Sequence, residues 1–234
     1  MFAREAAWIA EALAAEDPNA LAPLLNVGSS TRSFRTEVQP WIHDCLIAPL
    51  EARGARFVHL DLKEADGVDI AADILADEGF ARAKAVGAKA LLLCNILEHV
   101  VDPGEVARRA MALVEPGGLV VFTGPRSYPY HRDPIDTLFR PTPEDVAALF
   151  PGATIERAEI LPCGSYRDVV RKRPWVLLRP VVRFPFPFLG WERWKRTMGK
   201  LYWLFNPYLT TCVVLRTPAA SPEAIRSPSG AVST

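Results

Sequence analysis

Short apolar segments that end in small or polar residues recur along the chain. The first five predict strands at Pro23–Gly28, Arg56–Leu60, Gly67–Asp73, Ala90–Cys94 and Leu119–Thr123. Segments this short and apolar are typical of strands that are covered by helices on both faces. Two further strands are expected at Ala153–Leu161 and Leu209–Arg216. The pattern predicts an α/β fold with a mainly parallel sheet.

Helix start signals stand between these strands. Asp102 is expected to cap a helix whose first residue is Pro103, with Glu105 three residues after the cap. Thr142 and Asp145 predict a second capped start in the same way. The first helix links two predicted strands, which makes a βαβ unit with its polar groups at the carboxyl end of the strand.

Two earlier segments also have helical character. Apolar residues at helical spacing, from Phe2 to Leu13, predict a helix at the N-terminus. Such a helix either crosses the ligand edge of the sheet or only packs against it. A second helix is expected to start at Pro40 and to bend or end at Pro49.

Composition narrows the class of protein. The 234 residues suit one domain, 1–217, followed by a Ser/Pro/Ala-rich tail, 218–234, that we expect to be disordered. The formal net charge is zero, so nothing global indicates nucleic acid. The four cysteines, Cys45, Cys94, Cys163 and Cys212, lack metal-binding spacing, so we expect no metal and interpret them as buried, reduced thiols of a cytoplasmic protein.

Residues 166–208 differ from the rest of the chain. They hold 11 of its 22 aromatic residues, and from Tyr166 to Arg216 there are 11 Lys and Arg against two acids. Basic residues beside tryptophan and phenylalanine suit an anionic membrane surface. A lid and a dimer-forming insert are the alternatives. No uncharged run is long enough to span a bilayer.

Residues 95–123 also carry a family resemblance. Asn95–Val100 (NILEHV), a short helix, Glu115–Gly118 (EPGG) and a strand together resemble the class I S-adenosylmethionine-dependent methyltransferases, in particular the methyltransferase type 11 group. The likeness spans Pro23 to Phe150, including a YPYHxDPxD segment. It implies a doubly wound, Rossmann-like sheet of seven mainly parallel strands, with the last strand antiparallel and the aromatic, basic insert before it.

The resemblance implies S-adenosylmethionine as the cofactor. A glycine turn after the first strand approaches the cofactor closely in this family, and an acid after the second strand, here Asp61, is placed at the ribose hydroxyls. Asp73 corresponds to an acid near the adenine amino group. The expected contacts are Asn26, Gly28, Ser29, Ser30, Asp61, Asp73, Asn95 and Leu97.

The glycine turn is depleted, because only Gly28 of the usual glycines is present. Two other functions therefore stay open. One is a cofactor-binding regulatory or partner subunit without catalysis, and the other is a peripheral membrane module that binds another nucleotide-like ligand. The absence of GxGxxG lowers the expectation of a nicotinamide enzyme.

Methyl transfer to a hydroxyl needs a base on the acceptor side. His131, oriented by Asp133, is the first candidate, and His99 is the second. Tyr128, Tyr130 and Arg126 are expected to shape the acceptor pocket. The resemblance implies a wide range of acceptors, including sugars, lipids, quinones and small natural products, and the basic, aromatic insert favours an anionic, glycan or lipid-linked one. We expect O-methylation of a small-molecule, glycan or lipid-linked acceptor.

Overall fold

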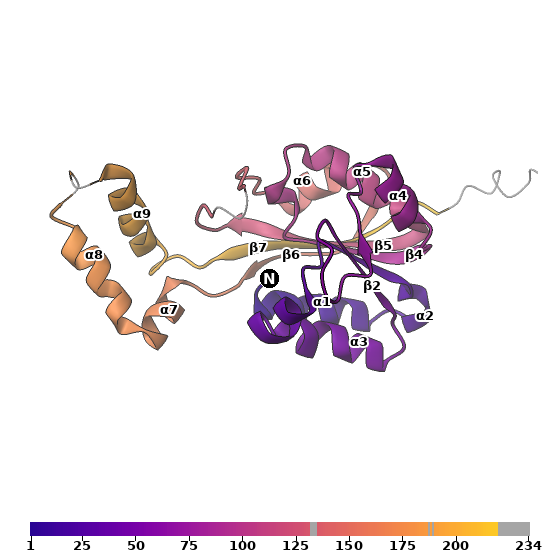
Figure 1. The fold of residues 1–234 in the computed structure, drawn as a ribbon, viewed down its shortest axis with the longest axis horizontal. Coiled ribbons are helices and arrows are strands. Elements are labelled where there is room, and N and C mark those ends of the chain that lie inside the picture. The colour runs from indigo at the N-terminus through magenta and orange to yellow at the C-terminus, as the bar shows by residue number, and fades with distance from the viewer. Residues whose placement is uncertain (132–134, 187, 189, 220–234) are drawn as a thin grey trace, which may run out of the picture.

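A seven-stranded sheet organises the computed structural model, which describes residues 1–131, 135–186, 188 and 190–219 (Figure 1). The strand order is β3-β2-β1-β4-β5-β7-β6. Pairing is parallel from β3 to β5, and β7 is antiparallel to both of its neighbours. The strands are β1 Leu24–Val27, β2 Phe57–Asp61, β3 Ile70–Ala71, β4 Ala88–Cys94, β5 Val114–Ser127, β6 Thr154–Pro162 and β7 Leu209–Arg216. The predicted mainly parallel sheet with an antiparallel last strand is confirmed.

Helices cover both faces of this sheet (Figure 1). The α-helices are α1 Ala3–Ala14, α2 Pro18–Leu21, α3 Ala48–Ala52, α4 Asp77–Lys84, α5 Pro103–Leu113, α6 Pro143–Ala148, α7 Tyr166–Lys172, α8 Leu178–Arg183 and α9 Trp191–Tyr202. Short 3-10 and π segments are η1 Phe34–Val38, η2 His43–Ile47, η3 Leu97–His99 and η4 Pro174–Leu177. Alternation along β4 divides the core, because Leu91 and Leu93 face the α4–α6 layer whereas Ala90 and Leu92 face the α1–α3 layer.

Both predicted helix starts are confirmed. The Asp102 side chain accepts a hydrogen bond from the backbone N–H of Glu105 at 3.0 Å. Thr142 and Asp145 form a reciprocal capping box at the start of α6. Each start needs only residues within three positions of the cap, which is why the local pattern was sufficient.

Two predicted boundaries were wrong, and a third was right in part. Residues 115–118 belong to β5 rather than to a separate turn, because β5 starts at Val114, which pairs with Ala88 ahead of a register shift. The helix after Pro40 does not end at Pro49 but changes from π to α geometry at Ala48 and runs to Ala52, with Pro49 in the first turn of α3. The strand β3 is short, and the Asp69 side chain before it accepts the His59 N–H at 2.7 Å.

The thiols and the chain end also differ in part from expectation. Cys163 and Cys212 are buried and Cys94 is half-buried, but Cys45 is exposed. The backbone oxygen of Pro218 accepts a hydrogen bond from the N–H of Gly117 at 3.0 Å, so ordered contacts extend past residue 217. The rest of the expected tail, residues 220–234, lies outside the described residues.

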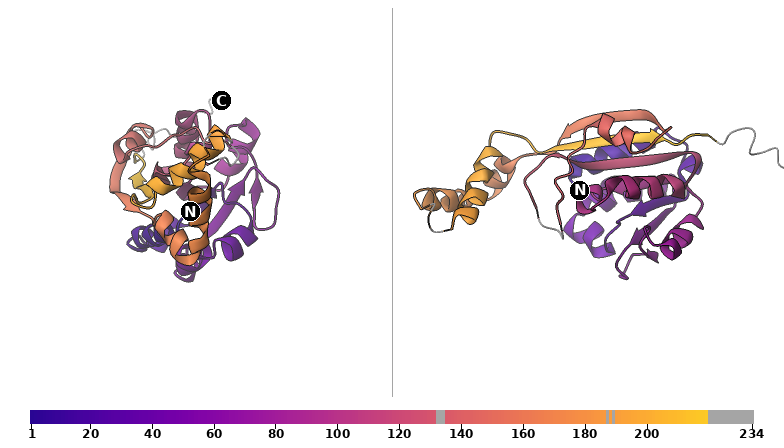
Figure 2. Two further views of the ribbon diagram at one scale, coloured as in Figure 1. Left: turned by 90° about the vertical axis from the view of Figure 1, so that its left-hand side faces the viewer. Right: turned by 90° about the horizontal axis from the view of Figure 1, so that it is seen from above.

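The insert between β6 and β7 carries η4, α7, α8 and α9. These helices extend beyond the sheet and do not fold over it (Figures 1 and 2). Within the described residues, no helix is both long enough and apolar enough to cross a membrane.

Candidate active site

A cavity of about 560 Å³ opens at the carboxyl ends of β1, β4 and β5. Its walls come from the turn after β1, from residues 94–99 after β4, and from the loop after β5. This is the edge at which open α/β sheets bind ligands. The volume lies within the range of small-molecule and cofactor sites.

The turn after β1 forms one wall. Gly28 has φ +68°, and a Cβ at this position would overlap the end of the Ile96 side chain, so a larger residue would be strained and would require Ile96 to move. Ser29 and Ser30 also line the cavity, and Ser30 has a positive φ of 56°. The N–H of Ser30 donates to Oδ2 of Asp61 at 2.7 Å.

Three of the other predicted cofactor residues do not line the cavity. Asp61 lies beside this turn but does not line the cavity, and its Oδ1 accepts from the N–H of Lys63 at 3.2 Å. Asp73 is exposed outside the cavity and accepts from the N–H of Leu75 at 2.9 Å. Leu97, another predicted cofactor contact, is completely buried in the core, and its side chain does not line the cavity.

Asn26 lines the cavity and donates from Nδ2 to Nδ1 of His59 at 3.2 Å. Burial, with a smaller effect from the charge of Arg35, lowers the pKa of His59 to about 4. The imidazole is therefore neutral at physiological pH and can accept this hydrogen bond. His59 holds the amide of Asn26 in place on the strand below the cavity.

Arg35 is a cavity residue that the sequence pattern did not single out. Its side chain is buried, and it donates to the backbone oxygens of Ser29 at 2.9 Å and Ser30 at 2.6 Å, and to that of Gly67 at 2.7 Å. Burial lowers its pKa and the charge of Asp69 opposes this, but a guanidinium stays protonated in proteins. A fixed positive charge therefore holds the turn after β1.

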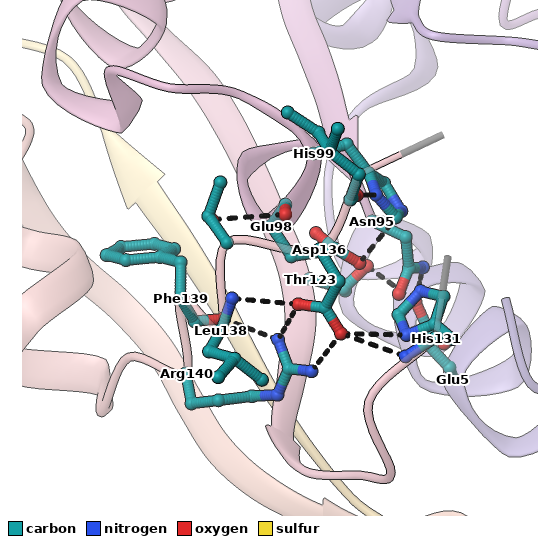
Figure 3. A network of polar contacts seen from close by, with 12 residues as sticks. Glu5, Asn95, Glu98, His99, Thr123, His131, Asp136, Leu138, Phe139 and Arg140 are labelled. Atoms are coloured by element: carbon teal, nitrogen blue, oxygen red, sulfur yellow. Dashed lines mark hydrogen bonds and ion pairs between the residues drawn. The ribbon is translucent and has the colours of Figure 1, made fainter. Parts of the chain in front are cut away.

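The N-terminal helix packs against the sheet beside α3, as its second interpretation predicts, and the residues at its start, Met1 and Phe2, line the cavity. Oε1 of Glu5 in α1 accepts from Asn95 Nδ2 at 2.7 Å and from Thr123 Oγ1 at 2.6 Å (Figure 3). Its Oε2 accepts from the N–H of Phe2 at 2.9 Å. Glu5 is completely buried and joins α1 to the ends of β4 and β5. The predicted contact residue Asn95 is thereby held in a fixed orientation.

Two histidines from distant segments meet at the opposite end of the cavity. The rings of His99 and His131 pack edge to face with centroids 5.1 Å apart (Figure 3). His99 Nδ1 donates to the backbone oxygen of Ile135 at 2.5 Å, which leaves Nε2 as the unprotonated nitrogen of the neutral ring. That Nε2 lies 3.8 Å from Oε1 of Glu98.

Glu98 was quoted in the sequence motif but not assigned a role. Its side chain is 2% exposed, and its Oε2 has no hydrogen-bond partner among the described residues. Burial raises the pKa of Glu98 to about 7, although the charge of His99 opposes the increase. A buried carboxyl with such a pKa changes protonation near neutrality and can accept or release a proton.

His131 is held beside Asp136 through its backbone, because its backbone N–H donates to Oδ2 of Asp136 at 3.1 Å. The ring Nδ1 lies 3.2 Å from the same oxygen but has no hydrogen-bond partner among the described residues. Burial opposes ionisation of Asp136, but bonds from Arg140 and from two backbone N–H groups outweigh it and lower the pKa to about 2. Asp133, the predicted partner of His131, lies outside the described residues.

Of the residues predicted to shape the acceptor pocket, only some line the cavity. Tyr128 lines the cavity, with its ring 5.4 Å from that of His131. Tyr130 is exposed and does not line the cavity. Arg126 donates to the backbone oxygen of Arg140 at 2.8 Å and so braces the loop.

The described residues also include three possible metal ligands at this end of the cavity. One ligand atom from each of Glu98, His99 and His131 lies within 4.8 Å of the others. Sequence spacing gave no sign of this set, because His131 joins it only through the fold. Two imidazoles and a carboxylate can hold a divalent cation or move a proton.

A seven-stranded, mainly parallel sheet whose last strand is antiparallel is the arrangement that the sequence resemblance to the class I methyltransferases implied. No protein-family model matches the chain, and no curated protein matches it either.

Several solved structures are similar to the chain. The [4+2]-cyclase SpnF is 16% identical with a TM-score of 0.47, covering 93% of this chain and 82% of that one. A putative sarcosine dimethylglycine methyltransferase from Galdieria sulphuraria is 13% identical with a TM-score of 0.47, covering 92% and 86%. Coclaurine N-methyltransferase, bound to N-methylheliamine and SAH, is 13% identical with a TM-score of 0.49, covering 90% and 69%.

Proposed function

We propose that this protein is an S-adenosylmethionine-dependent methyltransferase that methylates a hydroxyl group. The observation that carries the proposal is the single cavity that joins the turn after β1 to the pair His99 and His131. One end therefore presents a tight glycine turn and the other presents groups that can take a proton. A donor and an acceptor bound in this cavity would lie next to one another.

The cofactor end consists of the turn Gly28–Ser30 together with Asn26 and Asn95. Asp61 supports the turn by accepting the Ser30 N–H, and we assign its carboxylate to the ribose hydroxyls. The positive charge of Arg35 suits the carboxylate of the methionine portion. Asp73 and Leu97 receive no cofactor contact in this proposal, because the exposed Asp73 carboxylate accepts from the N–H of Leu75 rather than from the turn after β1, and Leu97 is buried in the core.

The acceptor end consists of His131, His99 and Glu98, with Tyr128 as an apolar wall. Transfer of a methyl group from a sulfonium is an in-line displacement, so the protein must align donor and acceptor and exclude water. The acceptor oxygen loses its proton during or after attack. His131, held by Asp136, takes this proton in our proposal, with His99 and Glu98 as neighbours that can pass it on.

Titration with S-adenosylmethionine and a turnover assay test the proposal. Binding together with an acceptor that gains the mass of one CH₂ group supports it. Binding without turnover on any hydroxyl acceptor supports a non-catalytic cofactor-binding subunit instead. Absence of binding to S-adenosylmethionine and to its demethylated product contradicts both.

A further inference from the structure

Residues 166–208, called the projecting module below, leave the sheet at the edge that holds the cavity. Pro162, the last residue of β6, pairs with Leu209, the first residue of β7, and Leu209 also pairs with Ser127 at the end of β5. The helices of the module continue outward from this edge (Figures 1 and 2). The module is therefore attached beside the cavity and extends away from it.

Aromatic contacts fix the base of the module to the cavity wall. The ring of Tyr208 lies 5.0 Å from that of Tyr128 and 6.0 Å from that of Phe2, both of which line the cavity. Trp203 packs against Tyr208 at 5.4 Å. The N–H of Tyr208 donates to the backbone oxygen of Gly164 at 2.7 Å. The two segments by which the chain enters and leaves the module are thus joined to each other and to the mouth of the cavity.

Large apolar side chains of the module face solvent. Those more than half exposed include Trp175, Val181, Phe184, Phe188, Trp191 and Phe205. The sheet domain does not cover them, because the module extends away from it (Figure 2). Apolar exposure concentrated in one part of a protein marks an interaction surface.

Positive charge accompanies these apolar groups. The module has ten Lys and Arg residues and two acids, a net charge of +8. One acid, Asp168, accepts from the N–H of Ser165 at 2.8 Å, and the other, Glu192, lies 2.7 Å from Lys195 Nζ. Two copies of the module would repel one another, which disfavours a dimer through this surface. A partner with an anionic surface and an apolar interior matches both the positive charge and the exposed apolar side chains of the module.

A groove of about 780 Å³ between the module helices has the same character. Val176, Leu178 and Val182 supply apolar walls, and Arg179, Arg183 and Lys200 supply positive charge. In α9 the rings of Trp191 and Trp194 stack at 5.3 Å, with Lys195 Nζ 5.6 Å from the centre of the Trp191 ring. Tryptophan and lysine side chains of this kind have an apolar body and a polar tip, which suits the boundary between headgroups and acyl chains.

We propose that the projecting module docks on the surface of an anionic lipid bilayer. Its aromatic and aliphatic side chains enter the interfacial layer, and its Lys and Arg side chains bind the headgroups. Docking tethers the sheet domain with its cavity to the membrane, because Tyr208 at the base of the module is packed against the cavity wall. Together with the proposed methyl transfer, on which this step rests, it makes a lipid-linked acceptor the substrate class.

Flotation of the full-length protein with vesicles tests the docking. Vesicles of phosphatidylcholine with phosphatidylglycerol should bind the protein at about 0.05 M salt and at least about tenfold more weakly at about 0.5 M salt. Phosphatidylcholine alone should bind weakly. The fluorescence of the module's tryptophans should shift to shorter wavelength on the anionic vesicles. Absence of binding at low salt, or equal binding to both vesicle types, would overturn the proposal.

Matched variants locate the surface. Arg179→Ser with Arg183→Ser should weaken anionic-vesicle binding by up to about 25-fold, about fivefold for each charge. Arg56→Ser with Arg108→Ser removes the same charge from the exposed surface of the sheet domain and should change binding by less than about twofold. Equal losses in both pairs would overturn the assignment to the module. A dimer in light scattering that Phe184→Ser dissociates would replace the membrane with a second copy.

Vesicle binding is measured without donor or acceptor. A failure of methyl transfer therefore leaves the docking result standing, and a failure of docking leaves the cofactor titration standing.

Discussion

Nδ1 of His131 lies 3.2 Å from Oδ2 of Asp136, whose carboxylate is held on its other side by Arg140. The arrangement places a buried, ionised carboxylate against the histidine that we propose as base. Asp136→Asn should lower turnover by about tenfold or more. Loss of the Asp136 charge should also leave the Arg140 charge unpaired, which should lower the free energy of unfolding by about 3 kcal/mol. Turnover and the free energy of unfolding report the two effects.

A pH titration separates the role of the Asp136 charge from simple misfolding. The pKa of Asp136 is depressed in the folded protein to about 2, so its contribution to stability is present above the ordinary pKa of 3.8 and is lost as the pH falls toward 2. The Asp136→Asn variant should lack this loss. Arg140→Lys keeps the positive charge next to Asp136. Its loss of stability at low pH should lie between that of the Asp136→Asn variant and that of the wild type. Unchanged turnover in Asp136→Asn would leave Asp136 with a structural role only.

Replacement of His131 distinguishes a base from a support. His131→Ala should reduce turnover by about 10²-fold or more while donor affinity stays within about twofold. His99→Ala is the comparison, because its ring lies next to that of His131 in the same cavity. A joint decrease of turnover and donor affinity would make His131 structural. A larger loss in His99→Ala would move the base to His99.

Glu98 should give the protein a stability that depends on pH. Its pKa is raised from 4.5 to about 7 by burial, so the folded protein binds more protons than the unfolded chain between these values. The free energy of unfolding should therefore fall as pH rises from about 4.5 to about 7. Glu98→Gln removes this pH dependence. The free energy of unfolding of the variant, relative to that of the wild type, should therefore be about 2–3 kcal/mol higher at pH 8 than at pH 4. Denaturant unfolding at the two pH values measures this difference, and an equal difference at both would show that the pKa of Glu98 is the same in the folded and unfolded states.

The cofactor end can be tested with two aspartates that differ in position. Asp61→Ala should weaken S-adenosylmethionine binding by about 1–3 kcal/mol, since it removes hydrogen bonds made by a charged group. Asp73→Ala is the matched control, because Asp73 is exposed and its carboxylate accepts from the N–H of Leu75, whereas that of Asp61 accepts from Ser30 in the turn after β1. Its affinity should change by less than about twofold. Calorimetry that finds equal effects in the two variants would remove Asp61 from the ribose site.

A chelator decides between the two chemistries open to Glu98, His99 and His131. If these residues move a proton, dialysis against EDTA should leave turnover within about twofold of the untreated enzyme. Elemental analysis of the purified protein is the control. Loss of turnover that a divalent cation restores would replace the proton-transfer assignment with a metal site on the same three residues.

Local sequence determined the elements of this fold. Apolar runs located the strands, although β3 is much shorter than predicted, and the starts at Asp102 and Thr142 needed only residues three positions away. The turn at Gly28 followed from its place after the first strand. These features depend on neighbours in the chain, so a pattern of adjacent residues contains them.

The tertiary structure alone decided the chemistry of the cavity. Glu5 contacts Asn95 and Thr123, which are 90 and 118 positions away, and the ring of His131 meets that of His99 from a different segment of the chain. The pKa of Glu98 depends on burial, which no local motif records. The projecting module was visible in composition, but only the fold attached it beside the cavity. Contacts between residues far apart in the chain arise when the sheet assembles, and the desolvation that shifts a pKa arises with them.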